Sequence, residues 1–299
     1  MGDHFDFSGL DSGAAVLERW RQSGRAFDAA GVRSFVAERG EGHAVVCMHG
    51  VPASAFLYRK VLGELATRGL RGLAFDLPGL GLAERPSAFD YTWSGLGRFG
   101  VAAVDALGLE RFHLVVHDIG GPVGFELAAA VPERIASLTV LNTLIEVDSF
   151  KRPWSMEPFA RRGIGEVYLR TLSKPAFRTL MRLQGIADMS AVARSELDAY
   201  VDLLKREDGG RAFLRIMRGF ERTAEKQRLY TSVVASDRYP VQVLWGGDDP
   251  ALKASVHGEI ARRIAGLDHL ETVPAKHFLQ EDQAPAVAAC VARVAAGSG

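Results

Sequence analysis

Short runs of apolar residues alternate with longer amphipathic stretches along the chain, and glycines and prolines separate them. Apolar runs of four to eight residues are typical of buried strands, whereas apolar positions three or four apart are typical of helices. The pattern predicts strands at Ala14–Arg21, Val32–Glu38, Ala44–Met48, Gly72–Asp76, Ser137–Leu144, Val241–Trp245 and His269–Val273. It predicts helices at Phe56–Thr67, Trp93–Leu107, Gly121–Val131, Ser255–Ile264 and Ala284–Ala296. This alternation indicates an α/β fold in which helices cover both faces of a mostly parallel sheet.

The alternation stops between residues 148 and 237. This stretch is rich in arginine and contains amphipathic segments at Glu166–Leu172, Pro175–Leu183 and Ser195–Lys205, without a convincing strand. A segment of this length is too long for a connecting loop. We therefore expect a core domain made of residues 1–147 and 238–299, with residues 148–237 inserted as a helical lid.

Composition narrows the class of partner. The chain has 299 residues, 24% of them charged, and a formal net charge of zero, so nothing suggests nucleic acid or a charged membrane as partner. Cys47 and Cys290 show no metal-binding or CxxC spacing and are predicted to be small buried residues. The N-terminus lacks the basic and apolar regions of a signal peptide, and no apolar run is long enough for a membrane helix. We expect a cytoplasmic monomer or homodimer.

The segment from Phe112 to Gly121 carries the most informative chemistry. It combines an apolar strand, a sharp turn and a helix start, which is the setting of a nucleophile elbow. The usual G-x-S-x-G has here become Val116-His117-Asp118-Ile119-Gly120. An aspartate is ionised at pH 7 and can attack without a base, which suits displacement at a saturated carbon. The alternative role of Asp118 is a helix N-cap.

Four segments together resemble the α/β-hydrolases over nearly the whole chain, which implies an eight-stranded sheet. They are His49-Gly50-Val51-Pro52, His117-Asp118-Ile119-Gly120-Gly121, Trp245-Gly246-Gly247-Asp248-Asp249-Pro250 and Lys276-His277-Phe278-Leu279-Gln280-Glu281-Asp282. Their order, nucleophile then acid then histidine, is that of this fold. Within the superfamily the chain is similar to haloalkane dehalogenases and epoxide hydrolases, which use an aspartate nucleophile.

The resemblance implies a role for each residue of the site. Asp118 attacks carbon and forms an alkyl-enzyme ester, and His277 activates the water that hydrolyses the ester. Asp249 orients His277. The backbone N–H groups of Val51 and Ile119 form the oxyanion hole.

Several alternatives stay open beside this assignment. Asp248 competes with Asp249 as the acid, and Glu146 lies where some relatives place the acid. His49 and His117 flank the site and are interpreted as supporting hydrogen-bonding groups. The remaining histidines show no ligand spacing, so neither a metal site nor a cofactor is predicted.

The residues expected to stabilise the leaving group match neither the haloalkane dehalogenases nor the epoxide hydrolases fully. Dehalogenases commonly carry side-chain N–H donors where this chain has Val51 and Ile119, and Trp154 is the candidate replacement. Epoxide hydrolases use two lid tyrosines, of which Tyr200 matches the first. The sequence therefore predicts cleavage of a C–X bond in a small apolar organic substrate, with water as the second reactant. Haloalkanes and epoxides both remain candidate substrates, and a ligand-binding or near-inactive relative is the alternative of another class.

Overall fold

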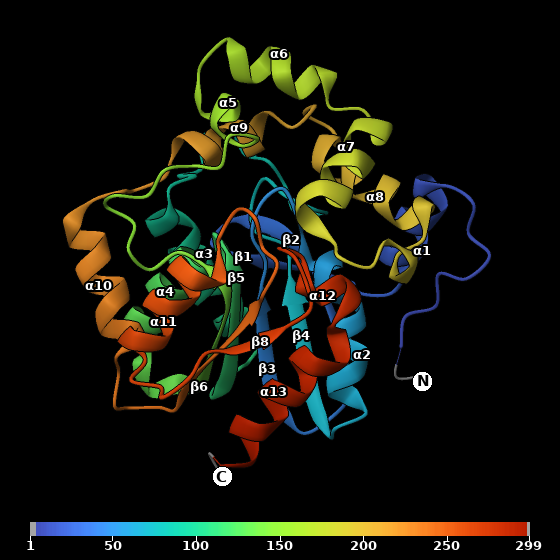
Figure 1. Ribbon diagram of the computed structural model, residues 1–299. Helices are drawn as coiled ribbons and strands as arrows, with labels where there is room; N and C mark the ends of the chain where they lie inside the picture. Colours follow the sequence, from blue (N-terminus) through green and yellow to red (C-terminus); the bar gives the residue numbers. More distant parts are fainter. Residues whose placement is uncertain (1–3, 298–299) are drawn as a thin grey trace.

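The computed structural model describes residues 4–297, and within that range the strands form one eight-stranded sheet (Figure 1). The strands are β1 (Arg25–Ala29), β2 (Val32–Arg39), β3 (His43–Met48), β4 (Leu70–Phe75), β5 (Phe112–Asp118), β6 (Ile135–Thr143), β7 (Val241–Gly246) and β8 (Glu271–Val273). Their order across the sheet is β1-β2-β4-β3-β5-β6-β7-β8. The pairs β1–β2 and β2–β4 are antiparallel and all other pairs are parallel. The predicted mostly parallel α/β sheet is confirmed.

Helices cover both faces of this sheet (Figure 1). One face carries α3 (Trp93–Ala106), α4 (Gly120–Ala130) and α11 (Glu259–Ile264); the other carries α2 (Arg59–Ala66) and α13 (Ala284–Ala296). The short helices η1 (Ala55–Tyr58), η2 (Pro132–Arg134), η5 (Ala254–Gly258) and α12 (Leu279–Asp282) connect these elements. Strands covered on both sides are apolar throughout, and this explains the uninterrupted apolar runs in the sequence.

Alternate side chains of β5 enter two separate cores. Leu114 and Val116 join the apolar cluster that includes residues of α3 and α4, whereas Val115 joins the cluster that includes residues of α2 and α13. All three are fully buried, as the two-residue period of a strand requires. Cys47 and Cys290 are buried free thiols in the second cluster, so their prediction as small core residues is confirmed.

The chain between β6 and β7 is helical. It contains α5 (Glu157–Ala160), α6 (Ile164–Thr171), α7 (Lys174–Leu180), η3 (Met181–Gly185), η4 (Met189–Ala191), α8 (Arg194–Lys205), α9 (Arg211–Arg218) and α10 (Ala224–Val234). Figure 1 places α5 to α9 over one end of the sheet, with α10 beside α4. No helix in residues 4–297 has the length and apolar character needed to cross a membrane.

The prediction of a strand at Ala14–Arg21 is wrong, because this segment lies in helix α1 (Gly13–Gln22). The Ser12 side chain caps the helix by accepting a hydrogen bond from the backbone N–H of Ala15 at 3.2 Å. Val16 and Trp20, one turn apart, are both fully buried. Their spacing of four residues is the helical signal. The first strand instead follows as β1, which had not been predicted.

Candidate active site

Asp118 occupies a sharp turn between the end of β5 and the start of α4. Its φ of +54° lies in the left-handed region, which residues other than glycine rarely adopt. Two glycines beside the turn leave no room for a side chain. A Cβ at Gly50 would lie 2.2 Å from Asp118 Oδ1, and a Cβ at Gly121 would lie 1.8 Å from Thr143 Oγ1. The Thr143 hydroxyl donates to the backbone carbonyl of Asp118. The turn is therefore held from both sides and presents the carboxylate at the end of the sheet.

Backbone N–H groups hold the carboxylate of Asp118. The N–H of Val51 donates to Oδ1 at 2.8 Å, and the backbone N–H of Ile119 favours the ionised form of this carboxylate. Burial opposes ionisation, but the hydrogen bond and charge of His277, together with the Ile119 N–H, hold the pKa of Asp118 below its usual value. The side chain is 18% exposed, so an ionised carboxylate faces open space in the site.

His277 lies between two carboxylates. Its Nε2 is 3.3 Å from Asp118 Oδ2, and its Nδ1 is 2.8 Å from Asp249 Oδ2. Burial opposes protonation of this ring, but the charges and hydrogen bonds of Asp249 and Asp118 outweigh burial and raise the pKa of His277 to about 10. The structure thus brings the three residues that the sequence singled out into one connected chain.

Asp249 is anchored at both carboxylate oxygens. Oδ1 accepts from the backbone N–H groups of Ala251 and Leu252 at 2.8 and 3.0 Å, and Oδ2 accepts from Asn142 Nδ2 at 2.7 Å. Burial alone would raise its pKa, but His277 and these donors lower the pKa of Asp249 well below the usual range. Asn142 also accepts from the backbone N–H of Gly246 at 2.8 Å, which ties the end of β6 to that of β7.

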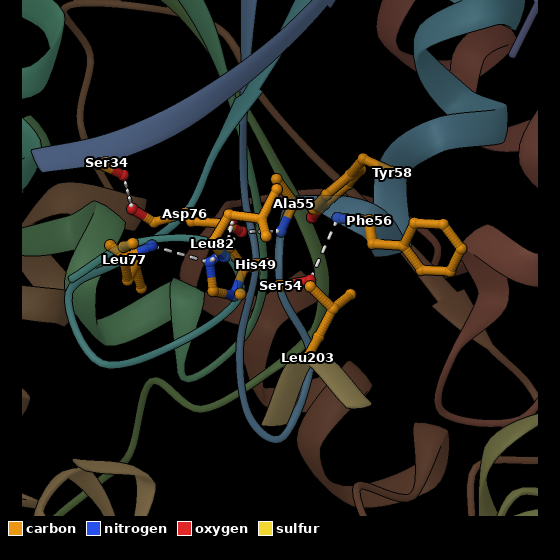
Figure 2. A network of polar contacts seen from close by, with 12 residues as sticks. Ser34, His49, Ser54, Ala55, Phe56, Tyr58, Asp76, Leu77, Leu82 and Leu203 are labelled. Atoms are coloured by element: carbon orange, nitrogen blue, oxygen red, sulfur yellow. Dashed lines mark hydrogen bonds and ion pairs between the residues drawn. The ribbon is translucent and has the colours of Figure 1, made fainter. Parts of the chain in front are cut away.

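His49 supports the loop that carries Val51. The backbone N–H of Leu77 donates to His49 Nε2 at 3.1 Å (Figure 2). Nε2 is therefore the acceptor, and Nδ1–H donates to Gly50 O at 2.9 Å. Complete burial, only partly opposed by the hydrogen bond to Gly50, lowers the pKa of His49 to about 4. The ring is therefore neutral and fixed in one tautomer.

Asp76, labelled in Figure 2, joins two loops near the site. Oδ1 accepts from the backbone N–H of Ala55 and Oδ2 from that of Leu82, both at 2.7 Å. Ser34 Oγ donates to the Asp76 backbone carbonyl at 2.6 Å. Burial raises the pKa of Asp76 to about 6 against these hydrogen bonds. Asp76 thus connects the Val51 loop to the loop after β4.

His117 lies next to His277, with the two ring centroids 4.8 Å apart. Its Nε2 contacts the backbone carbonyl of His277 at 2.8 Å, while Nδ1 is buried without a partner among the described residues. Burial, followed by the charge of His277, lowers the pKa of His117 to about 3. A neutral ring with its proton on Nε2 explains both the contact with the His277 carbonyl and the unpartnered Nδ1. The hydrogen bond from Nε2–H holds the His277 loop in place.

A pocket opens above Asp118, lined by the core and by the helices between β6 and β7. Val51, Ile119 and Leu252 come from the core, whereas Met181 and Met217 come from the helical segment. Within the described residues, the polar side chains that line it are Asp118, Arg152, Ser155, Gln184 and His277. All other lining residues are apolar or glycine, so the pocket suits a small, largely apolar molecule.

The two predicted leaving-group contacts do not lie in this pocket. Trp154 is 73% exposed and is not among the lining residues, because the chain on either side of it, Pro153 and Ser155, forms the wall. The Tyr200 hydroxyl instead donates to Glu281 inside a buried cluster. Glu281 is held there by two hydrogen bonds from Arg59, at 2.6 and 2.8 Å. Both predictions are corrected: packing turns these side chains away from the site.

The alternative acids lie elsewhere. Glu146 forms an ion pair with Arg263 at 3.3 Å, and Asp248 is exposed. Asp249, by contrast, is buried and is the carboxylate that contacts His277 Nδ1.

Sequence reasoning missed Asn142, Arg152 and Gln184. A signal for Asn142 existed, since it is a polar residue near the end of β6, where every position is buried. A register shift between His117 and Asp118 leaves Asn142 outside the β5–β6 pairing, and its side chain reaches Asp249. Arg152 is one of many arginines in the helical segment, and its sequence context does not distinguish it.

Comparison with known proteins shows the family to which the chain belongs. A family profile described as "alpha/beta hydrolase fold" matches residues 43–284. Among curated proteins, the chain is 28% identical to haloalkane dehalogenase 2 of Mycobacterium bovis, with 89% of this chain and 93% of that protein covered. It is 26% identical to a haloalkane dehalogenase of Psychrobacter cryohalolentis, with coverage of 82% and 80%.

Solved structures show the same fold. A haloalkane dehalogenase from Agrobacterium tumefaciens superposes with a TM-score of 0.75 at 22% identity, covering 92% of this chain and 97% of that one. An epoxide hydrolase from Vigna radiata superposes with a TM-score of 0.73 at 22% identity, covering 91% and 98%. At these identities the likeness establishes the fold alone.

Proposed function

Because this chain belongs to the alpha/beta hydrolase fold family, we propose that it hydrolyses a C–X bond at a saturated carbon, with Asp118 as nucleophile. The substrate is a small, largely apolar organic molecule, and the reaction is similar to that of the haloalkane dehalogenases among its relatives. The observation that carries this proposal is the connected chain Asp118–His277–Asp249, with an ionised carboxylate at the floor of an apolar pocket.

In the first step a carboxylate oxygen of Asp118 attacks the carbon that bears the leaving group. The C–X bond breaks, X⁻ departs with the bonding electrons, and Asp118 becomes a neutral alkyl ester. Oδ1 accepts from the N–H of Val51 at 2.8 Å, whereas Oδ2 makes the longer contact of 3.3 Å with His277 Nε2, so we assign the attack to Oδ2. No base is needed for this step, which fits a nucleophile whose pKa is lowered.

In the second step water attacks the Asp118 carbonyl carbon. His277 takes a proton from this water through Nε2, and Asp249 stabilises the resulting imidazolium through Nδ1–H. Negative charge then develops on Oδ1, and we propose that the N–H groups of Val51, which already donates to Oδ1, and of Ile119 stabilise it. The tetrahedral intermediate collapses by releasing the alcohol, which takes the proton from His277. The carboxylic acid left on Asp118 then passes its proton to His277, which restores both the carboxylate and the protonated ring.

The protonation of His277 must change between the two steps. In the free protein two carboxylates keep the ring protonated at pH 7, because they raise its pKa to about 10. Formation of the ester removes the charge of Asp118, and His277 then loses its proton to solvent. The ring becomes a base only after the ester has formed.

Residues 148–237 act as a lid in this proposal. Arg152, Met181 and Gln184 from this segment line the same pocket as Asp118. Two backbone hydrogen bonds join the lid to the catalytic loop, His277 N–H to Gln184 O at 3.4 Å and Phe278 N–H to Gly185 O at 2.7 Å. Closure over the pocket excludes bulk water from the nucleophile.

The pocket favours a halide over an epoxide. An epoxide oxygen needs a proton as the ring opens, and no tyrosine lines the pocket among the described residues. Tyr200 is bonded to Glu281, and the Tyr230 hydroxyl donates to Glu126 at 2.9 Å. A halide leaves as a stable anion and needs only donors. Epoxide hydrolysis is therefore the second reaction to assay.

The test is to trap the ester. His277→Phe, mixed with bromoalkanes or styrene-type epoxides, should accumulate a mass increase equal to the transferred group, which peptide mapping should place on Asp118. The matched control, Asp118→Asn with His277→Phe, should gain no mass. An inactive His277→Phe protein without an adduct on any substrate would refute the assignment of Asp118.

A further inference from the structure

Arg152 is a nearly buried cation in the wall of an otherwise apolar pocket. Its side chain is only 7% exposed. Nη2 donates to the backbone carbonyl of Met217 at 2.7 Å, and the guanidinium carbon lies 4.5 Å from the centre of the Phe220 ring. Nε is buried without a hydrogen-bond partner among the described residues. A guanidinium has five N–H donors, and within residues 4–297 this one makes a single hydrogen bond.

The charge of Arg152 is poorly compensated. The nearest carboxylate, Glu157, has an oxygen 3.8 Å from Nη1, beyond hydrogen-bond distance, and is itself 41% exposed. Glu157 also pairs with Arg161 at 3.5 Å, so its charge is shared. Burial, followed by the nearby charge of Arg222, lowers the pKa of Arg152. A buried cation is unfavourable unless it is paired, and an anion in the pocket would supply the missing partner.

Other donors in the pocket wall are few. Ser155 Oγ donates to Gln184 Oε1 at 2.8 Å, so its hydroxyl proton is already used. The predicted donors Trp154 and Tyr200 point elsewhere. Besides Arg152 and the proposed base His277, the lining residues in the described part of the chain leave only the amide of Gln184 as a free side-chain N–H donor.

We infer that Arg152 forms an anion-binding subsite in the pocket and that the protein acts on substrates that present a monovalent anion to it. This inference rests on the proposed function. The anion has two chemical sources: the halide that leaves during attack by Asp118, or a carboxylate that the substrate carries throughout. Both are bound by the same charge-assisted N–H donation.

Binding can be measured without turnover. The Asp118→Asn protein is titrated with bromide and with hexanoate by calorimetry at constant ionic strength. The same titrations are made on the double variants that combine Asp118→Asn with Arg152→Met, Arg152→Lys or Arg161→Met. We expect Arg152→Met to weaken binding of at least one anion by about 10-fold or more and Arg152→Lys to weaken it less. Arg161→Met removes an exposed arginine that shares Glu157 and should leave binding unchanged. Melting curves confirm that each variant is folded.

Turnover of matched substrates separates the two sources. If the substrate carries a carboxylate, Arg152→Met should lower kcat/KM for 6-bromohexanoate by about 10-fold or more, through KM, and should change kcat/KM for 1-bromohexane much less. If the halide is the anion, kcat should fall for both compounds, and more for chlorides than for bromides.

Two results would overturn the subsite: neither anion binds Asp118→Asn, or Arg152→Met behaves like Arg161→Met. If His277→Phe still forms an ester in that case, the proposed function stands and only the subsite is wrong. If no ester forms on any substrate while anion binding depends on Arg152, the subsite stands and the proposed function fails.

Discussion

Replacing Asp118 with asparagine imitates the neutral state that Asp118 reaches in the proposed ester, and it should release the proton of His277. His277 Nε2 lies 3.3 Å from Asp118 Oδ2. At an effective dielectric constant of about 20, opposite charges at this distance attract by about 5 kcal/mol. Loss of that attraction lowers a pKa by roughly 4. The pKa of His277, which is about 10 in the unmodified protein, should therefore fall to about 6 in Asp118→Asn.

The assay is NMR detection of the His277 ring across a pH series, with assignment through His277→Gln. Asp248→Asn removes the same charge from an exposed neighbour of Asp249 and should leave the titration unchanged. If the pKa of His277 differs by less than about 1 between the unmodified protein and Asp118→Asn, the two groups are not coupled as their distance implies. The idea that ester formation creates the base would then be wrong.

Other consequences are testable on the purified protein. The pKa of His277 is raised from 6.5 to about 10 in the folded protein. The stabilisation by protonated His277 is therefore complete below pH 6.5 and is lost as pH rises through about 10. In His277→Gln, the urea midpoint should not show this loss of stability with rising pH. Asn142→Ala removes a hydrogen bond to the Asp249 carboxylate and leaves the Gly246 N–H unpaired. It should lower the free energy of unfolding by about 3 kcal/mol, and a loss below about 1 kcal/mol would contradict this role. Tyr200→Phe should cost about 2 kcal/mol of stability in urea denaturation but leave turnover within about twofold; a large loss of turnover would return Tyr200 to the site. Trp154→Ala, at a position 73% exposed, should change neither stability nor turnover measurably.

Features of the fold that depend on local pattern could be predicted from the sequence. The apolar runs of β3 to β7 are buried on both faces, so their composition alone marks them as strands. The segment at α1 shows the limit of this reasoning. Its two buried residues, Val16 and Trp20, lie among charged residues, and only their spacing distinguishes a helix from a strand.

The candidate site also has a part that the sequence predicts and a part that depends on the fold. The sequence by itself determined that a carboxylate, Asp118, follows an apolar strand at a turn, and that a histidine and an acid come later in the order of this fold. Whether the three meet depends on which strands are neighbours, and the order β5-β6-β7-β8 brings them together.

The direction of the side chains in the helical segment between β6 and β7 was decided only by the tertiary structure. Trp154 and Tyr200 are residue types suited to a leaving-group site, yet one faces solvent and the other bonds to Glu281. Arg152, which resembles many other arginines in the sequence, lines the pocket. A helix has a polar and an apolar face whatever it packs against, but the residues that reach the pocket depend on contacts with distant parts of the chain. Those contacts have no local signature in the sequence, and they decide which polar groups meet the substrate.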